Sequence, residues 1–153
     1  MDTPLPSVIL RHAGLRPRHF GVAEEPLTGE DGGGRLPVDQ PGNPVSNTVA
    51  AARVLFDRIV TDQSDEVRAE LAFIYFALAK LFGVLADRKA QFTGLVTGRG
   101  GQVSTPLGSH DELMKAAARN YQEAKNLYPD AAWPPLDGEA TGGSIRVPRS
   151  YVP

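Results

Sequence analysis

The sequence predicts a mainly α-helical protein: a three-helix bundle with a long central helix, a glycine-tipped β-hairpin between the second and third helices, and extended N- and C-terminal arms. Two observations support this fold class. Seven of the 13 prolines lie in residues 1–44 and five in 129–153, which leaves only Pro106 between them. The proline-poor middle instead repeats apolar residues at the spacing of amphipathic helices. We therefore expect an arm at 1–43, a helical body at 44–128 and a second arm at 129–153.

The N-terminal arm shows no sustained helical or strand period. Its prolines interrupt any long helix and remove hydrogen-bond donors from any strand. Gly32, Gly33 and Gly34 add a flexible break. Two interpretations fit this composition: a disordered leader in the free protein, or an arm that a partner subunit holds in place.

The first helix is expected at about 44–61. Asn43 is a favourable N-cap residue, and Pro44 suits the first helical position. Apolar residues then recur at intervals of three and four, namely Val45, Val49, Ala52, Phe56 and Ile59. This spacing places them on one face of a helix.

The long central helix is expected at about 64–91. Its apolar residues follow a heptad seam made of Val67, Leu71, Ile74, Leu78, Leu81 and Leu85. Because the other faces are apolar too, we expect burial on several sides. The body is small, so the seam is expected to supply helix–helix core contacts, subunit contacts, or both, with burial against neighbouring copies favoured. A membrane span is disfavoured, since Lys80 interrupts the apolar run and Glu70 and Asp87 bracket it.

A β-hairpin is expected at 94–105, between the second and third helices. Short runs rich in Val and Thr flank a glycine-rich tip formed by Gly98, Arg99, Gly100 and Gly101. A capping box at Ser109–Glu112 then opens a third helix, expected at 110–128, which Pro129 ends.

The C-terminal arm ends in a stretch that alternates apolar and polar residues like a single strand. Such a segment can add itself to the sheet edge of a neighbour. The residues expected to dock are Ile145, Arg146, Val147, Arg149 and Tyr151. A frayed tail is the alternative interpretation of the same pattern.

The motif search gives no support for an enzyme. The chain contains no cysteine, which excludes disulfides, thiolate metal sites and a cysteine nucleophile. The glycine loop lacks the Lys-Ser or Lys-Thr ending of a phosphate-binding loop. His12, His19 and His110 belong to no metal-ligand motif, and no nucleophile is spaced with a base and an orienting group. We therefore expect no catalytic, cofactor-binding or metal-binding residues.

The arrangement of Ser64–Gln91, the Gly94–Gly108 loop and the arm Ser144–Pro153 resembles the head-to-tail connector (adaptor) proteins of tailed bacteriophages. These proteins are small helical bundles that form a ring beneath the portal and grip it with an extended C-terminal arm. The resemblance covers 44–153 and is one of architecture, with no diagnostic motif. It implies a non-enzymatic virion protein that binds copies of itself in a ring and other structural proteins, such as a portal or tail component.

Other roles fit the same features. The long proline-rich leader departs from the usual connector pattern, which leaves capsid cement and tail-completion proteins as alternatives. A nucleic-acid-binding regulator or small packaging subunit is a further alternative. The net charge of −2 argues against specific nucleic-acid binding, because such proteins usually show a strongly basic face. We expect no membrane association, and a location in the virion if the protein is viral or in the cytoplasm otherwise.

Overall fold

The computed structural model describes residues 2–28, 33–96 and 108–136. The elements in chain order are α1 (Pro6–His12), the 3-10 turns η1 (Pro17–Phe20) and η2 (Pro37–Asp39), α2 (Pro44–Ile59), α3 (Glu66–Val96) and α4 (His110–Leu127). Within the described ranges the protein is mainly helical, as predicted. The three helices expected from the sequence correspond to α2, α3 and α4.

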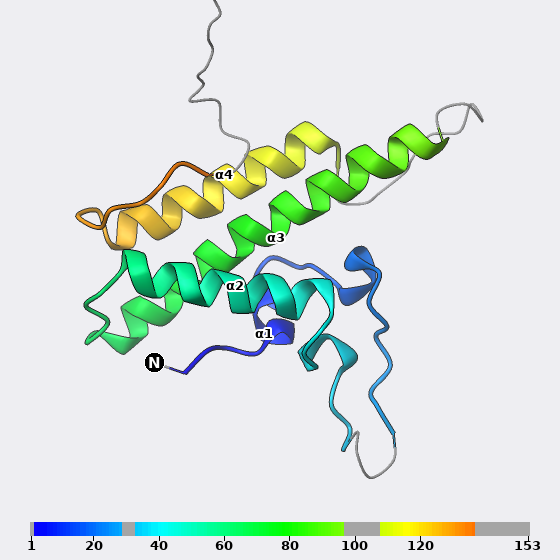
Figure 1. The fold of residues 1–153 in the computed structure, drawn as a ribbon, viewed down its shortest axis with the longest axis horizontal. Helices are drawn as coiled ribbons and strands as arrows, with labels where there is room; N and C mark the ends of the chain where they lie inside the picture. Colours follow the sequence, from blue (N-terminus) through cyan, green and yellow to red (C-terminus); the bar gives the residue numbers. More distant parts are fainter. Residues whose placement is uncertain (1, 29–32, 97–107, 137–153) are drawn as a thin grey trace, which may run out of the picture.

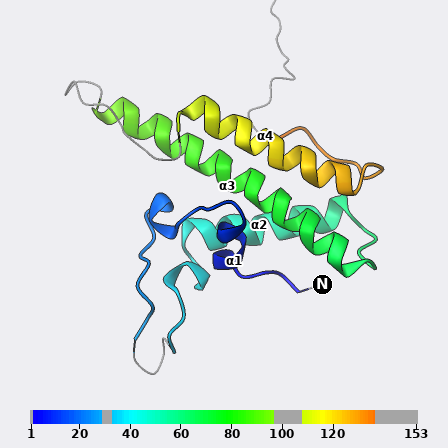
Figure 2. The ribbon, with the colours of Figure 1, turned by 180° about the vertical axis from the view of Figure 1, so that it is seen from behind.

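The long helix α3 is the centre of the fold. The helix α4 runs antiparallel along one side of it, and α2 crosses it on another side (Figure 1). Seen from behind, the short helix α1 lies at the crossing of α2 and α3 and contacts both (Figure 2). Most of the middle of α3 is therefore buried by other parts of the same chain.

Side-chain caps set where α2 and α4 begin. Asn43 Oδ1 accepts hydrogen bonds from the backbone N–H groups of Val45 and Ser46, both at 2.9 Å. At the start of α4, Ser109 Oγ accepts from Glu112 N–H at 3.2 Å, and Glu112 Oε1 accepts from Ser109 N–H at 2.9 Å. Each cap satisfies amide donors that a helix leaves unpaired in its first turn.

Aromatic side chains form the middle of the core. Phe56 of α2 meets Phe73 of α3 edge-to-face, with 5.5 Å between the ring centroids. Tyr121 of α4 and the indole of Trp133 are also perpendicular, at 5.8 Å. Phe56, Phe73 and Tyr121 are almost completely buried. Pairs of this geometry typically contribute about 0.5–1.5 kcal/mol beyond their area burial.

The N-terminal segment differs from the extended arm that its composition suggested. Pro6, Pro17 and Pro37 each stand at the start of a short helical turn, the position where a missing N–H costs nothing. The segment also supplies buried side chains to the common core, namely Ile9, Leu10, Leu15, Phe20, Val22 and Val38. Its turns of seven, four and three residues are too short to show a helical period in the sequence.

A polar contact joins two parts of this N-terminal segment. Both carboxylate oxygens of Asp39 in η2 accept hydrogen bonds from Ser7, one from the backbone N–H and one from the hydroxyl, each at 2.8 Å. Asp39 thus satisfies an amide in the first turn of α1 from 32 residues away. The segment is held by specific bonds as well as by apolar burial.

The expected hairpin is not supported. The helix α3 continues to Val96, so residues 94–96, which were expected to begin the first strand, are helical. No strand occurs in the parts of the chain that the structure describes. The rest of the expected hairpin, including the tip residues Gly98, Arg99, Gly100 and Gly101, lies outside the described residues. The central helix was expected to end at about residue 91. It continues to Val96, into a region whose glycine content had suggested a hairpin.

The first part of the expected C-terminal arm packs on the bundle. The indole N–H of Trp133 donates to the carbonyl oxygen of Tyr128 at 2.8 Å. The hydroxyl of Tyr121 donates to the carbonyl oxygen of Pro134. Leu136, the last described residue, is buried. Residues 129–136 are therefore part of the folded body and not of a free arm.

Candidate protein-interaction surface

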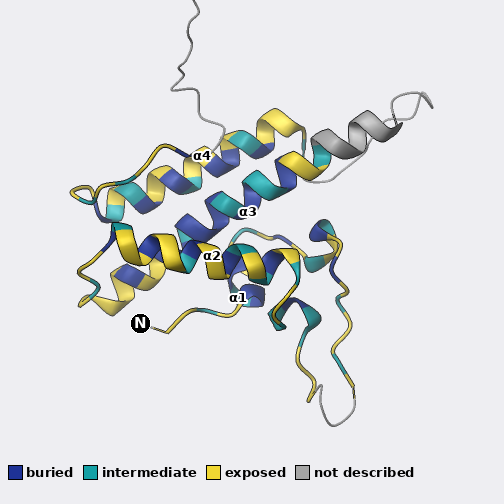
Figure 3. Ribbon diagram, in the orientation of Figure 1, coloured by how far each residue is buried: buried dark blue, intermediate teal, exposed yellow. Residues whose placement is uncertain are grey.

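The heptad seam divides into a buried part and an exposed part. Ile74, Leu78, Leu81 and Leu85 are all at least 96 % buried within the single chain. Val67 is 81 % exposed and Leu71 is 36 % exposed. Figure 3 shows the same change along α3, from an exposed first turn to a buried middle. We call Val67 and Leu71 the α3 apolar pair.

The middle of α3 does not need neighbouring copies to cover it, contrary to the preference stated from the sequence. Its apolar sides meet α2, α4 and the N-terminal segment, which the sequence had suggested was an arm. The chain therefore has more material for its core than the expected body at 44–128. Only the first turns of the helix still expose seam residues to solvent.

The outer face of α2 exposes two more large apolar side chains. Val54 is 53 % exposed and Leu55 is 38 % exposed. Leu55 also forms part of the wall of a neighbouring cleft. Isolated exposed apolar residues are common on soluble proteins, so Val54 needs no further explanation. The more informative observation is that Leu55 is continuous with a concave surface.

A cleft of about 620 Å³ lies between α2, α3 and α4. Its lining is mostly apolar, with small residues such as Ala52, Ala79, Gly83 and Ala117 and larger ones such as Leu55, Val84, Met114 and Leu136. Thr48, Lys80, Asp87, His110 and Asp111 complete the lining. A concave apolar surface with a few polar groups is the usual composition of a binding site. We call this surface the three-helix cleft.

Small side chains on the facing helices leave open the space that forms the three-helix cleft. Ala79 and Gly83 lie four residues apart on α3, so they share one face of that helix. Gly83 has an ordinary helical backbone, and a Cβ atom at this position would meet nothing within 4 Å. This small-residue pair is a signal in the sequence that could have indicated the cleft, and our sequence reasoning missed it.

The other predicted contact residues cannot be placed. Ile145, Arg146, Val147, Arg149 and Tyr151 lie outside the described residues, as does the expected glycine tip. The last described residue before them is Leu136, which is buried and lines the three-helix cleft. The docking role of these residues stays a prediction.

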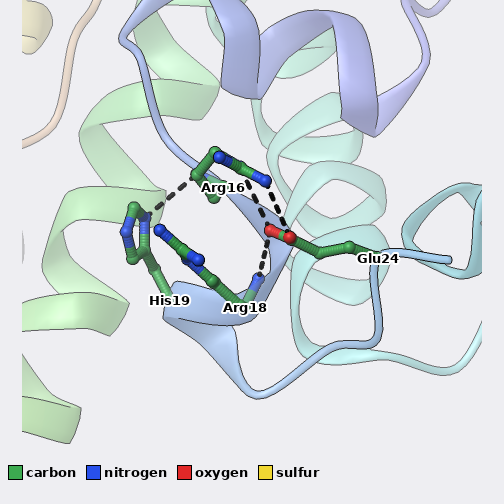
Figure 4. A network of polar contacts seen from close by, with 4 residues as sticks. All are labelled: Arg16, Arg18, His19 and Glu24. Carbon is green, nitrogen blue, oxygen red and sulfur yellow. Dashed lines mark hydrogen bonds and ion pairs between the residues drawn. The ribbon is translucent and has the colours of Figure 1, made fainter.

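A polar network joins the residues around η1 (Figure 4). Arg16 donates from Nε and Nη2 to the two carboxylate oxygens of Glu24, at 3.2 and 2.8 Å. The backbone N–H of Arg18 donates to the same carboxylate at 3.4 Å, and that of Arg16 donates to Nδ1 of His19 at 3.0 Å. These bonds close the loop between η1 and Glu24, so a structural role accounts for them.

Burial, hydrogen bonds and charges in this network shift two pKa values. Desolvation, followed by the positive charge of Arg18, lowers the pKa of His19. Desolvation acts to raise the pKa of Glu24, but hydrogen bonds from Arg16 and Arg18 outweigh it, and the pKa falls below its ordinary value. His19 is therefore largely neutral and Glu24 charged near neutral pH.

Acidic residues at the start of α3 also have local structural partners. Asp62 Oδ1 accepts from the hydroxyl and the backbone N–H of Ser64, at 2.7 and 3.1 Å. The hydroxyl bond is the main cause that lowers the pKa of Asp62. Asp65 accepts from the backbone N–H of Arg68 at 3.2 Å, as a helix cap does. Within the described ranges, no group of three or more His, Asp or Glu side chains is arranged to hold a metal ion.

Among the residues that the structure describes, one buried side-chain oxygen lacks a hydrogen bond of good geometry. The hydroxyl of Tyr128, at the end of α4, is inaccessible to solvent and makes no hydrogen bond. The guanidinium of Arg68 lies 4.0 Å from the centre of its ring. Burial is the main cause that raises the pKa of Tyr128, so its phenol stays protonated at neutral pH. The ring thus links α4 to the first turn of α3.

The helix α3 is also long and apolar enough, over Glu66–Lys89, to cross a membrane by length and composition alone. About two thirds of its most apolar stretch is buried by the rest of the chain. Core helices of soluble proteins share this property, so the observation carries little weight for a membrane role.

Comparisons with known protein families, with characterised proteins and with solved structures find no match to this chain. The geometry alone therefore describes the candidate site. It consists of a helical bundle with an exposed apolar pair at one end of its longest helix and an apolar cleft between three helices.

Proposed function

We propose that the protein is a non-enzymatic structural subunit that binds other copies of itself through the α3 apolar pair. The observation that carries this proposal is the 81 % exposure of Val67. This residue continues a heptad seam whose later members are buried. A heptad position on one helix is complementary to the same positions on another helix, so a second copy of α3 is a suitable partner.

The proposal explains why an apolar side chain stands where a charged one would be expected. Glu66, Arg68 and Glu70 surround Val67 in the sequence and are exposed, so this stretch of α3 is otherwise polar. Val67 and Leu71 lie four residues apart on one face of α3, so they form a small continuous apolar surface. A contiguous apolar surface with polar residues around it is typical of contact sites between proteins. The pair is small, and further contacts are needed for a stable interface.

The exchange Val67→Asp tests this contact. Because Val67 is exposed in the single chain, the variant should keep its fold, as measured by circular dichroism. It should nevertheless lose self-association, as measured by light scattering after gel filtration over a range of concentrations. An aspartate on each copy would bring like charges together in a dry contact.

A matched control is Val54→Asp, the same exchange at an exposed valine of α2. This variant should assemble as the wild type does. Unchanged assembly of Val67→Asp, or equal loss in both variants, would contradict the proposed contact.

The more specific proposal is the one that the resemblance implied, a connector or neck subunit of a tailed bacteriophage that forms a ring. A long central helix within a small helical body supports this assignment, while capsid cement and tail-completion roles share the same support. Negative-stain images of native particles with a tagged subunit distinguish them. A ring at the neck is expected, whereas label over the shell or at the tail end would favour the alternatives.

A further inference from the structure

The three-helix cleft and the C-terminal residues complement one another in chemistry. The cleft has a mostly apolar lining whose charged side chains are two carboxylates, Asp87 and Asp111, and one ammonium group, Lys80, so carboxylates outnumber the single cation. His110 also lines the cleft and lies 3.6 Å from the Asp111 carboxylate. Residues 144–153 alternate apolar and polar positions, and their only charged residues are Arg146 and Arg149. In an extended segment, Arg149 shares one face with Ile145 and Val147, whereas Arg146 lies on the opposite face. The apolar side chains can then enter a groove, with Arg149 beside them and Arg146 at its edge, where each arginine can reach a carboxylate of the lining.

The chain also leads from this cleft toward the segment. Leu136 is buried and lines the cleft, and seven residues separate it from Ser144. An extended chain covers at most about 3.3–3.6 Å per residue, so this connection spans roughly 25–30 Å. That reach is comparable to the diameter of a small domain, which suits a connection from one subunit to the next.

We propose that the three-helix cleft is the receptor for residues 144–153 of a neighbouring copy. This inference rests on the proposed self-association and names a second contact for it. Ile145, Val147 and Tyr151 supply the apolar side chains, and Arg146 and Arg149 pair with Asp87 and Asp111. The contact is heterologous, because the arm of one copy meets the cleft of the next, and repeated contacts of this type generate rings or filaments.

The absence of cysteine makes a direct test available, because any introduced cysteine is the only thiol in its chain. One full-length protein carries Thr48→Cys at the cleft, and another carries Ser150→Cys in the arm. The Ser150→Cys chain carries a fusion tag, so that the heterodimer differs in mass from both homodimers, and the two proteins are mixed under mild oxidation and analysed on a non-reducing gel. A disulfide-linked heterodimer is expected, because a disulfide requires Cα atoms within about 7 Å of one another.

Two matched variants of the Thr48→Cys chain connect the cross-link to the cleft. Gly83→Leu extends a side chain into the cleft from a position where the added Cβ atom meets nothing within 4 Å, and should reduce the cross-link roughly tenfold or more. Ala118→Leu adds the same side chain at an exposed position of α4 outside the cleft lining and should leave the yield unchanged. Equal yields in these two variants would overturn the inference.

The remaining outcomes separate this inference from the proposed function. A protein that assembles but gives no cross-link would overturn the cleft as receptor while leaving the α3 contact intact. A protein that stays monomeric at all concentrations would overturn both.

The double variant Thr48→Cys/Ser150→Cys provides the last check. If it closes a disulfide only within one chain, the arm belongs to its own cleft and the contact between copies is refuted.

Discussion

The first turns of α3 and its middle share one heptad pattern but lie in opposite environments. Val67 is 81 % exposed, whereas Leu78 is only 2 % exposed. The seam face of the middle is covered by α2, α4 and the N-terminal segment, whereas in the first turns the face that carries Val67 is exposed although Ala69 is buried. An apolar period therefore specifies which face of a helix must be covered, but not whether the same chain or a second copy covers it.

The largest effect is expected from Leu78→Asp. This exchange places an unpaired charge in the core, which typically costs about 3–5 kcal/mol. We expect loss of cooperative folding in urea denaturation followed by circular dichroism. Val67→Asp, the same type of exchange at the exposed end of the seam, should change the unfolding free energy of the dilute protein by about 0.5 kcal/mol or less. Similar costs in the two variants would remove the distinction between the two parts of the helix.

The next largest loss of stability is expected from a substitution that tests whether the N-terminal segment covers the middle of α3. Ile9 of α1 is completely buried, so Ile9→Ala should lower the unfolding free energy by about 2–5 kcal/mol. The neighbouring exposed residue Arg11 is the control, and Arg11→Ala should have little effect. If Ile9→Ala leaves the urea midpoint unchanged, the N-terminal segment is an arm after all.

A smaller change, this time a gain in stability, is expected from a substitution where α4 meets the first turn of α3. The Tyr128 hydroxyl is buried without a hydrogen bond, and such a group carries a desolvation penalty of about 1–3 kcal/mol. Tyr128→Phe removes the hydroxyl and keeps the ring under Arg68. The variant should therefore unfold at equal or higher urea concentration. A clear loss of stability would show that the hydroxyl has a partner in solution.

The smallest effect concerns the surface network around η1, which helps to hold the N-terminal segment in place. The folded state lowers the pKa of Glu24, so its contribution to stability is present above the ordinary glutamate pKa and is lost as the pH falls through the lowered value. Glu24→Gln should be slightly less stable than the wild type at pH 7. The difference should disappear once the pH has fallen below the lowered pKa of Glu24, and a difference that persists when the carboxyl is protonated would point to another cause.

The sequence predicted α2, α3 and α4 well because each begins at a recognisable cap or follows a long apolar period. Asn43 and Ser109 bond to nearby amides, so their role depends only on a few neighbouring residues. The N-terminal segment was misjudged for the opposite reason. Its helical turns are short, and Asp39 stabilises α1 from 32 residues away. Contacts of this range are invisible to a search for local periods.

The features of the candidate site also divide into those that local sequence predicts and those that depend on distant contacts. The sequence by itself determined the apolar seam, the absence of cysteine and the near-balanced charge, since these follow from residue types and their spacing. Only the tertiary structure decided that Leu78 is buried by its own chain, that Val67 is exposed and that Ala79 and Gly83 line a cleft. Exposure depends on which distant segments pack against a helix, and that choice belongs to the whole chain and not to any local pattern.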